Sequence, residues 1–536
     1  MLRVLRHYLP LRRALLVFSE TVILFAVLAT GMTAHLWEPT YTVIGLITSE
    51  SLTVGDAQVR CTISAFLVAV LAQIAIAFNE LYDFRISSSR YDRASRFVGS
   101  TGSAVALALV TVLLARVWEL SRVFDFPGLT VSQLVQALVF TLLFGFSLLY
   151  VWRHLFHVAL RRVNFNERVL ILGAGPQAKS LAREALERVD SGFEVVGLVP
   201  ERPEEHPRGA ARAVPEIPRF QRADPTPPTQ SDSAILAEGA LATLLLEPLP
   251  APVPASSSNG NGHAHALEPL FDLVDRLRVD MVVVALEDRR GHLPTEELLR
   301  CRLAGIAVKE REALYEQITG KIAVEAMRPS YLIFNEGFAR SERGELAKRA
   351  CDLGLSALGI FLTWPLMLAT AIVVKLDSPG FAMFSQERVG LNGKLFTLYK
   401  FRSMRSDAEK LTGPVWATEN DPRITRSGRF IRKTRLDELP QLFNVLSGDM
   451  SLVGPRPERQ VFVDNLARQI PYYHQRHIVK PGLTGWAQIN YPYGNTVDDA
   501  LQKLQYDLFY IKNQSLLFDL SILFQTIKTV VLRKGT

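Results

Sequence analysis

Four long apolar stretches dominate the hydrophobic pattern of the first 150 residues, at residues 14–36, 62–78, 97–117 and 132–151. Each is close to the roughly 20 residues that a helix needs to cross the hydrocarbon core of a bilayer. Apart from Glu20, near the start of the first stretch, no ionisable residue lies deep inside any of them. The pattern predicts four transmembrane helices that act as an anchor and a partner surface, with no sign of an ion path.

Basic residues are distributed unevenly among the segments that flank these stretches. They gather before the first stretch, between the second and the third, and after the fourth, whereas the other two loops hold one each, Arg60 and Arg122. Because cytoplasmic loops carry the excess of Lys and Arg, both ends of this region are expected in the cytoplasm. A cleaved signal peptide is not expected, since the first stretch is long and three more follow it.

After the fourth stretch the pattern changes to a short apolar strand, a tight turn and an amphipathic helix. The turn has the form Gly-x-Gly-x-x-Ala and places Gly173, Gly175 and Ala178 where a dinucleotide-binding fold presents N–H groups to a pyrophosphate. Glu201 follows the second strand at the position of a ribose-binding acid. Residues 166–335 are therefore predicted to form a Rossmann-like domain. Its nucleotide loop is either vestigial or regulatory, and loss of NAD or other nucleotide binding is favoured over its retention.

A proline-rich insertion interrupts this domain at about residues 200–263. It holds 12 of the 29 prolines together with the sequence SSSNGNGHAH. Such a composition buries too little apolar surface to offset the entropy of ordering, so the insertion is predicted to be disordered. The domain pattern then resumes with a helix, a strand at 280–286, a second helix and a strand at 305–309.

A fifth apolar stretch, at about residues 353–375, contains Pro365 at its middle, next to Trp364. At ~1.5 Å per residue its length of roughly 33 Å would suffice to cross a bilayer. Proline removes a backbone hydrogen bond and kinks a helix. Both flanks are basic, so a crossing would also export an arginine-rich segment against the positive-inside rule. A re-entrant helix that enters the membrane and returns is predicted, and a kinked membrane span is the alternative.

The residues that follow alternate between apolar and polar side chains around Gly390, Asn392 and Gly393, which predicts a β-hairpin. The second half of this hairpin contains Lys400 and Arg402. These two cations either meet phosphate groups near the membrane face of a site or remain solvated charges at the end of a strand.

The most densely charged segment, residues 421–458, places positive charge directly ahead of two adjacent carboxylates, Asp437 and Glu438. At about 4 Å, one Arg–phosphate pair near a protein surface has a Coulomb energy of roughly 4 kcal/mol before desolvation, and arginine can bind two oxygens at once. Several such cations together could hold a diphosphate. A spacing of about three keeps them on one side of a helix; they are Arg423, Arg426, Arg429, Arg432, Lys433 and Arg435.

The two carboxylates admit two interpretations. Asp437 followed by Glu438, with Pro440 in the first turn, has the form of a helix N-cap. A carboxylate pair beside six cations also suits Mg²⁺, which takes few protein carboxylates and completes its shell with water and substrate phosphate. The same cations favour the ionised form of Asp437, which a nucleophile requires.

Three features lie downstream of the carboxylates. In the sequence GPRP, two prolines place Arg456 in a rigid turn that suits a phosphate clamp. His474 and His477 have no third ligand nearby, which argues against a zinc site. The C-terminal segment, which ends in Arg533 and Lys534, is predicted to be either a helix in the membrane interface or a helix packed on the core.

Composition adds limits to this picture. A length of 536 residues exceeds a single hydrophobic core and suggests three units. A mean hydropathy of +0.14 with 21% charged residues indicates membrane segments together with sizeable soluble parts. The net charge of +7 suits anionic lipid or nucleic acid, and the position of basic residues beside apolar stretches favours lipid. The three cysteines, Cys61, Cys301 and Cys351, form no disulfide or metal pattern, which fits a reduced cytosolic setting.

Three motifs carry a family resemblance: FSQERVGLNGKLFTLYKFRSM at 384–404, TRLDELPQLFNVLSGDMSLVGPRPE at 434–458 and VKPGLTGWAQIN at 479–490. From about Lys348 to the C-terminus the chain resembles the bacterial sugar transferases, and its layout resembles the large monotopic phosphoglycosyl transferases. The resemblance implies an α/β catalytic domain with a re-entrant helix broken at a proline. It also implies transfer of a hexose 1-phosphate from a UDP-sugar to polyprenyl (undecaprenyl) phosphate with release of UMP, the first membrane step of exopolysaccharide or other glycoconjugate synthesis.

The resemblance also implies roles for individual residues. Asp437 would attack the β-phosphorus and form a covalent aspartyl-phosphosugar, and Asp437 and Glu438 would hold Mg²⁺. The phosphoryl oxygens would be bound by Lys400, Arg402, Arg435 and Arg456. The motifs encode neither the hexose nor the polysaccharide pathway.

The predicted architecture is a multidomain membrane protein with a four-helix transmembrane region at 1–165, the Rossmann-like domain at 166–335 and the catalytic domain at 336–536. Such a multi-pass protein is expected in the bacterial inner membrane with its soluble and catalytic domains in the cytoplasm. The expected partners are a UDP-sugar, polyprenyl phosphate and the membrane, whereas nucleic acid is not expected. A homodimer and contact with later glycosyltransferases of the pathway are compatible with the sequence, which does not encode the oligomeric state.

Two other functions fit parts of the chain less well. The turn at Gly173 would suit an NAD-dependent sugar-nucleotide epimerase or dehydratase. None of the fourteen tyrosines, however, has a lysine four residues later, as the usual Tyr-x-x-x-Lys pair of those enzymes requires. A membrane scaffold or polysaccharide-assembly sensor would need no carboxylate pair.

Overall fold

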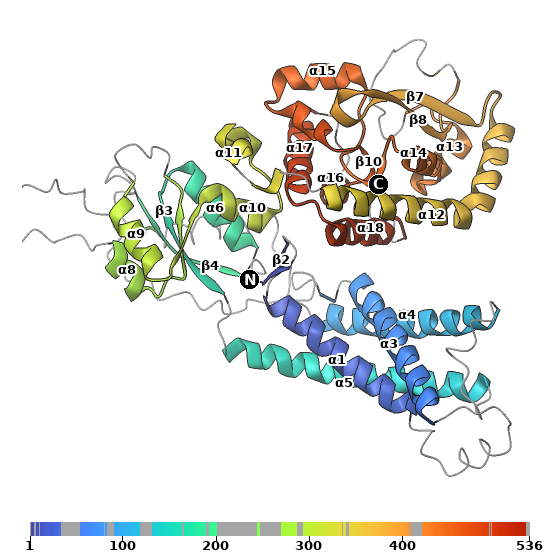
Figure 1. Cartoon of the computed structure of the whole chain (residues 1–536), viewed down its shortest axis with the longest axis horizontal. Coiled ribbons are helices and arrows are strands. Elements are labelled where there is room, and N and C mark those ends of the chain that lie inside the picture. Colours follow the sequence, from blue (N-terminus) through green and yellow to red (C-terminus); the bar gives the residue numbers. More distant parts are fainter. Residues whose placement is uncertain are drawn as a thin grey trace, which may run out of the picture. The chain divides into compact units, whose positions relative to one another are not determined.

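The structure of the protein is a computed structural model in which the chain forms two compact units (Figure 1). One unit comprises Tyr8–Lys309 with Met1–Leu2, and the other comprises Glu310–Thr536 with Arg3–His7. Each unit is described by itself below. The structure describes residues 2–4, 7–9, 11–33, 54–79, 81–82, 90–117, 131–162, 166–188, 192–200, 244–246, 270–286, 293–327, 329–334, 336–338, 342–406, 408, 421–491, 494 and 496–531.

The four apolar stretches at the start of the chain are helical, as predicted. After two short strands, β1 (Leu2–Val4) and β2 (His7–Leu9), they form four long helices: α1 (Leu11–Thr33), α3 (Val54–Phe78), α4 (Arg90–Val117) and α5 (Val131–Arg162). The helices pack side by side around small and aliphatic side chains (Figure 1). Large apolar side chains such as Phe18 and Phe140 face outward, and each helix is long and apolar enough to cross a membrane.

A buried ion pair joins three of these helices or their ends. Arg153 on α5 donates to both oxygens of Glu20 on α1 at 2.8 Å. The same guanidinium donates to the carbonyl of Leu81, just after α3, and the hydroxyl of Tyr82 donates to Glu20 at 2.8 Å. Glu20 is therefore fully paired, which is the usual condition for a charge inside an apolar bundle.

The chain after α5 forms an α/β region whose four-stranded sheet has the strand order β4-β3-β5-β6. Strand β3 lies parallel to both β4 and β5. Its elements are β3 (Glu167–Leu172), α6 (Pro176–Glu187), β4 (Phe193–Val199), α8 (Leu270–Arg276), β5 (Met281–Val284), α9 (Thr295–Leu303) and β6 (Ala307–Glu310).

The predicted nucleotide turn connects β3 to α6. Gly173 has φ +120°, and a Cβ there would lie 2.6 Å from the carbonyl oxygen of Ala285, so only glycine fits. Gly175 is the N-cap of α6, and Ala178 is fully buried in that helix. Pro176 occupies the first helical turn, so one backbone donor that a pyrophosphate would use is missing.

Most of the proline-rich insertion, and Glu201 with it, lies outside the described residues. The exceptions are Pro200 at its start and residues 244–246. The amide of Leu198 donates to the carbonyl of Leu244 at 2.7 Å, and the amide of Leu246 donates back to Leu198 at 2.8 Å. This short piece of the segment predicted to be disordered therefore extends the sheet beside β4.

The second unit contains the predicted hairpin and a set of short helices and strands. Strands β7 (Met383–Val389) and β8 (Leu395–Phe401) are antiparallel, which confirms the hairpin. The other elements are α10 (Arg311–Thr319), α11 (Pro329–Phe334), α12 (Glu342–Asp377), α13 (Arg426–Lys433), α14 (Gln441–Ser447), β9 (Ser451–Val453), α15 (Gln460–Gln469), β10 (Gly482–Thr484), α16 (Trp486–Asn490), α17 (Val497–Lys512) and α18 (Leu516–Val531). Short 3-10 helices include η9 (Leu436–Glu438) and η10 (Tyr473–Ile478).

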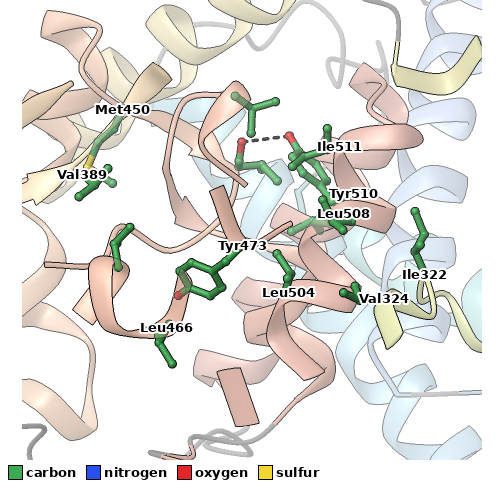
Figure 2. Close-up of a cluster of buried hydrophobic side chains, with 14 of the residues drawn as sticks. Ile322, Val324, Val389, Met450, Leu466, Tyr473, Leu504, Leu508, Tyr510 and Ile511 are labelled. Carbon is green, nitrogen blue, oxygen red and sulfur yellow. Dashed lines mark hydrogen bonds between the residues drawn. The ribbon is translucent and has the colours of Figure 1, made fainter. Parts of the chain in front are cut away.

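The core of this unit lies between α17, the parallel pair β9 and β10, and the helices around them. Figure 2 shows Tyr473, Leu504, Leu508 and Tyr510 among its buried side chains. The hydroxyl of Tyr510 donates to the carbonyl of Val453 at 3.0 Å, so α17 is tied to β9 within the core.

The residues between β6 and α12 pack onto α17. Glu316 on α10 accepts hydrogen bonds from the Tyr331 hydroxyl at 2.6 Å and from the Asn513 amide at 3.1 Å, and it pairs with Lys512. The indole of Trp486 donates to the carbonyl of Gly320 at 3.0 Å. Residues 310–334 are therefore built into the C-terminal unit.

Helix α12 contains the fifth apolar stretch and extends beyond both of its ends, with Pro365 inside. Its ribbon changes direction partway along (Figure 1). Arg349 donates to the carbonyls of Val445 and Leu446 at 2.6 and 2.8 Å. At the far end of the helix, Asp377 accepts from the amide and hydroxyl of Ser427 at 3.0 and 2.8 Å. Both ends of α12 therefore bind the same compact unit.

The C-terminal helix α18 combines the two predicted alternatives. Phe518 and Ile522 are buried in the core, whereas Leu517, Leu520 and Ile527 are exposed. One face thus packs on the unit and the other presents apolar side chains outward. The predicted basic end at Arg533 and Lys534 lies outside the described residues.

Candidate active site

The carboxylate pair lies in a tight turn between α13 and α14. Arg435 adopts the left-handed conformation, with φ 60° and ψ 15°, and η9 then carries Asp437 and Glu438. A left-handed non-glycine residue is uncommon and costs conformational energy, and such residues cluster at functional sites. Neither η9 nor α14 has a side-chain cap hydrogen bond, and the N-cap of α14 is Pro440. The interpretation of Asp437 as a helix N-cap was therefore wrong.

This turn rests directly on helix α12. Leu436 and Leu439, which flank the carboxylates, pack against a small apolar cluster that includes Met367 and Val374 of α12 and Phe401 of β8. The acids are thus held beside the second half of the helix that contains Pro365.

Glu438 is locked by two guanidinium groups. Arg456 donates to its Oε1 at 2.8 Å, and Nη1 of Arg435 lies 3.6 Å from the same oxygen. Burial opposes the ionised form of Glu438, but the charges of Arg456 and Arg435 and the hydrogen bond from Arg456 outweigh it and hold the pKa of Glu438 below its usual value. Glu438 is therefore a fixed anion.

Asp437 differs from its neighbour. Its side chain is buried, with a relative exposure of 8%, and within the described part of the chain no group donates a hydrogen bond to its carboxylate. Burial and the adjacent charge of Glu438 raise the pKa of Asp437 to about 6, against the opposing effects of Lys400, Arg432 and Arg456. Lys400, Arg432 and Arg456 favour the ionised form of Asp437, as predicted for the surrounding cations, but desolvation and the charge of Glu438 outweigh them.

Lys400 faces this pair from strand β8. Its Nζ lies 5.3 Å from the centre of the Phe384 ring. Burial lowers the pKa of Lys400 to about 8, helped by the charge of Arg388, while Asp437 and Glu438 oppose the change. The ammonium group is thus poorly solvated and is stabilised by any further anion that enters the site.

Arg456 extends from a turn whose backbone is held from four directions. The carbonyl of Pro455 accepts from the amide of Gly482 at 2.9 Å, and the carbonyl of Glu458 accepts from the amide of Val389 at 2.9 Å. The two carbonyls between them accept from arginine side chains: buried Arg476 donates to the carbonyl of Arg456 at 3.1 Å, and half-buried Arg388 donates to the carbonyl of Pro457 at 3.1 Å.

Two predicted phosphate ligands have other partners. Arg402 donates to the carbonyls of Ser378 and Pro379 at 2.7 and 2.6 Å, so its guanidinium holds the segment that follows α12. Arg423 pairs with Asp421. Of the remaining cations in the arginine-rich segment, Arg432 and Arg435 act on the acid pair, whereas the others are exposed on α13: Arg426, Arg429 and Lys433.

Two residues of the site were missed in the sequence. Arg388 influences Lys400 and supports the Pro457 carbonyl. The sequence could have indicated Arg388. It is four residues from Phe384 on one strand, so the two side chains lie on the same face of β7, and Phe384 lies beside Lys400. Arg476 is buried behind Arg456, and nothing in its local sequence distinguishes it from a surface arginine.

The donor set of the site fits Mg²⁺. Within the described residues no group of three or more His, Cys, Asp or Glu converges. Asp437 and Glu438 are the carboxylates of this site that would hold a metal. Mg²⁺ is commonly bound by one or two carboxylates with water and substrate phosphate. Asp437 has acceptor oxygens without a hydrogen-bond donor among the described residues, and the adjacent charge of Glu438 disfavours its ionisation. A divalent cation would relieve both conditions.

Asp437, which is buried, and Glu438, which is half-buried, lie beside several cations in an α/β unit that packs on a long apolar helix. These features define a membrane-associated α/β protein. Residues 343–533 match the family described as bacterial sugar transferase. The chain is 42% identical over 194 residues to the exopolysaccharide production protein PSS of Rhizobium leguminosarum bv. phaseoli, a match that covers 35% of this chain and 96% of that protein. The protein belongs to the bacterial sugar transferase family.

Two further relatives are matched over only part of their own length. The chain is 44% identical over 256 residues to the UDP-N-acetylgalactosamine-undecaprenyl-phosphate N-acetylgalactosaminephosphotransferase of Aeromonas hydrophila, covering 48% of this chain and 60% of that protein. It is 46% identical over 200 residues to the UDP-glucose:undecaprenyl-phosphate glucose-1-phosphate transferase of Xanthomonas campestris pv. campestris, covering 37% of this chain and 41% of that protein. The matches thus span less than two thirds of these two proteins.

Proposed function

We propose that the protein transfers a hexose 1-phosphate from a UDP-sugar to polyprenyl (undecaprenyl) phosphate and releases UMP, as the first membrane step of exopolysaccharide or other glycoconjugate synthesis. The names of the relatives support this reaction class. The observation that carries the proposal is the difference between the two acids. Glu438 is locked by Arg456 and Arg435, whereas Asp437 is buried beside cations without a hydrogen-bond donor among the described residues. An acid so placed can act as a nucleophile.

In the first step, a carboxylate oxygen of Asp437 attacks the β-phosphorus of the UDP-sugar. The bond from that phosphorus to the bridging oxygen breaks, and UMP leaves with the electron pair. The sugar phosphate is then bound covalently as an acyl phosphate on Asp437. Lys400 and Arg456 bind the phosphoryl oxygens and stabilise the charge that develops on them.

In the second step, a phosphate oxygen of polyprenyl phosphate attacks the same phosphorus. The acyl phosphate bond breaks, and the carboxylate of Asp437 is restored. The lipid leaves as a polyprenyl diphosphate sugar. When bound by Asp437 and Glu438, Mg²⁺ would neutralise diphosphate charge and favour departure of UMP.

The proposal includes a re-entrant course for α12. A straight helix of this length would separate its ends by about 50 Å. Its first turns instead bind α14 through Arg349, and its last residue, Asp377, binds α13 through Ser427. The side chains around the bend, such as Phe361 and Trp364, are 71% and 55% exposed. Entry and return through one leaflet would bury these side chains in lipid and keep Asp437 at the surface where a lipid phosphate arrives.

We extend the proposal to the rest of the chain with the predicted bounds. Residues 1–165 would form a four-helix transmembrane region in the bacterial inner membrane. The soluble domain predicted at 166–335 and the catalytic domain predicted at 336–536 would lie in the cytoplasm, and residues 310–334 of the predicted middle domain pack within the catalytic unit. The parallel pairing of β3 and the positive φ of Gly173 support a Rossmann-like fold for the middle domain. Pro176 favours a vestigial nucleotide loop, because it removes one donor.

The course of α12 predicts a labelling pattern. In a variant without the native cysteines, Arg343→Cys and Lys375→Cys place single thiols at exposed positions near the two ends of the helix. Both are expected to react with a membrane-impermeant maleimide in inverted inner-membrane vesicles and to stay unlabelled in intact spheroplasts. Reaction of the two sites from opposite sides would show that α12 spans the bilayer.

Lys400 predicts an alkaline limit for substrate binding. A protonated ammonium attracts the diphosphate, so KM for the UDP-sugar is expected to rise on the order of tenfold as pH passes through about 8 and above. Lys400→Arg keeps its charge at these pH values and should shift that rise to higher pH. Lys394→Arg, an exposed change in the same hairpin, serves as the control. A wild-type KM that stays constant across this range would contradict the role of Lys400.

The reaction itself is tested by mass spectrometry of lipid products. Purified full-length protein is incubated with polyprenyl phosphate, Mg²⁺ and a panel of UDP-sugars. A polyprenyl diphosphate sugar is expected from at least one donor, together with an equal amount of UMP. Release of UDP, or a lipid monophosphate sugar as the product, would show transfer of the sugar without its phosphate and would overturn the assignment.

A further inference from the structure

The turn that presents Arg456 has few free torsions. Pro455 and Pro457 fix their own φ angles near −65°, and each also restricts the residue before it. The direction of the Arg456 side chain therefore depends chiefly on the backbone of Arg456 itself. That residue's carbonyl oxygen accepts a hydrogen bond from Nη2 of Arg476 at 3.1 Å.

Arg476 is itself held on several sides. Its Nη2 lies 2.8 Å from a carboxylate oxygen of Asp507 on α17, and its Nη1 donates to the hydroxyl of Tyr473 at 2.7 Å. All three side chains are buried, and the ring of Tyr473 lies in the apolar core (Figure 2). The other ionisable groups that act on this cluster are Glu458, Lys503 and His477.

Stability alone does not explain this buried pair. The desolvation of two buried charges commonly offsets their mutual attraction, so an apolar replacement is often no less stable. Burial raises the pKa of Asp507 to about 6 even though Arg476 opposes the change. The pair does, however, fix a planar guanidinium with several donors behind one peptide group. Only an arginine can bind Asp507, Tyr473 and the Arg456 carbonyl at once in this geometry.

We propose that Arg476, held by Asp507 and Tyr473, is a positioning residue for the transfer reaction. By holding the carbonyl of Arg456, it sets the direction in which the Arg456 guanidinium reaches Glu438 and the phosphoryl group of the substrate. This proposal rests on the proposed function. It assigns to a buried pair on α17 and η10 a part in catalysis that involves no contact with substrate.

A double-mutant cycle on the full-length protein tests this role. Arg476→Lys keeps the charge beside Asp507 but loses the planar set of donors. It is expected to lower kcat at least about tenfold while changing KM for the UDP-sugar less than about threefold, because misplacement of Arg456 matters most in the transition state. In an Arg456→Ala background, the same Arg476→Lys change should lower kcat less than about twofold.

The outcomes separate positioning from folding. If Arg476→Lys lowers kcat by the same factor with and without Arg456, Arg476 does not act through Arg456 and the proposal is overturned. If the Arg476→Lys protein does not fold, Tyr473→Phe, which removes only one hydroxyl, replaces it in the double-mutant cycle. The loss in kcat caused by Tyr473→Phe should likewise disappear in the Arg456→Ala background. Asp519→Asn is the matched control, because it breaks the ion pair between buried Asp519 and half-buried Lys348 elsewhere in the unit. It should lower the melting temperature, and its effect on kcat should be the same with and without Arg456.

Failure of the proposed function would look different. A wild type without any transferase activity would contradict the proposed reaction, whereas an Arg456→Ala protein as active as wild type would exclude only the role of Arg456 and, with it, positioning through Arg456. An active wild type with an additive cycle would overturn the positioning role alone.

Discussion

Replacement of Asp437 by asparagine is expected to lower kcat for sugar-phosphate transfer by about 10⁴-fold or more. The amide has nearly the shape of the carboxylate but cannot supply the attacking oxyanion. The measurement is product formation from a radiolabelled UDP-sugar with polyprenyl phosphate as acceptor. Asp449→Asn makes the same chemical change at an exposed residue after α14 and should leave kcat unchanged. An Asp437→Asn protein with more than a tenth of wild-type activity would contradict the nucleophile.

The same variant should not be less stable than wild type. Burial and the charge of Glu438 raise the pKa of Asp437 to about 6 in the folded protein, above its value in the unfolded chain. The folded state therefore binds this proton more tightly, and the favourable contribution is lost as pH rises through about 6. At neutral pH the ionised Asp437 disfavours folding, and asparagine removes that effect. Thermal melting at neutral pH should show an equal or higher melting temperature.

Replacement of Arg456 by alanine is expected to lower kcat by about 10²–10³-fold, the usual loss when one preorganised transition-state contact is removed. Arg456 donates to Glu438 at 2.8 Å and lowers the pKa of both acids. Arg456→Lys keeps the charge but cannot hold Glu438 and a phosphoryl oxygen with one planar group, so it too should lose at least about tenfold. Arg468→Ala removes an exposed arginine from α15 and should have no effect. Full activity of Arg456→Ala would exclude a direct role.

The sequence predicts those features of the site that depend only on residues close together in the chain. The alternation around Gly390 and Gly393 correctly predicts the hairpin that carries Lys400. Asp437 and Glu438 are adjacent in the chain and lie together in η9, so their proximity needs no distant contact. These features depend on neighbours in the chain, so the sequence alone contains them.

Features that depend on distant contacts could not be predicted in this way. Arg402 and Lys400 are two residues apart, yet Arg402 binds carbonyls after α12 because that helix ends beside it. The pKa of Asp437 rises because the turn is buried, and burial depends on how Leu436 and Leu439 pack on α12. The pairing of Arg476 with Asp507 joins η10 to α17, and no spacing in the sequence marks it.

The covalent role of Asp437 is tested most directly by exchange of labelled UMP into UDP-sugar in the absence of any lipid acceptor. The substrate is a UDP-sugar that the full-length protein uses, at neutral pH with Mg²⁺. If the first step is attack by Asp437, wild type forms the enzyme-bound sugar phosphate, and returning labelled UMP regenerates labelled UDP-sugar, whereas Asp437→Asn shows no exchange. Exchange at the wild-type rate in the Asp437→Asn protein would contradict the covalent intermediate on this residue.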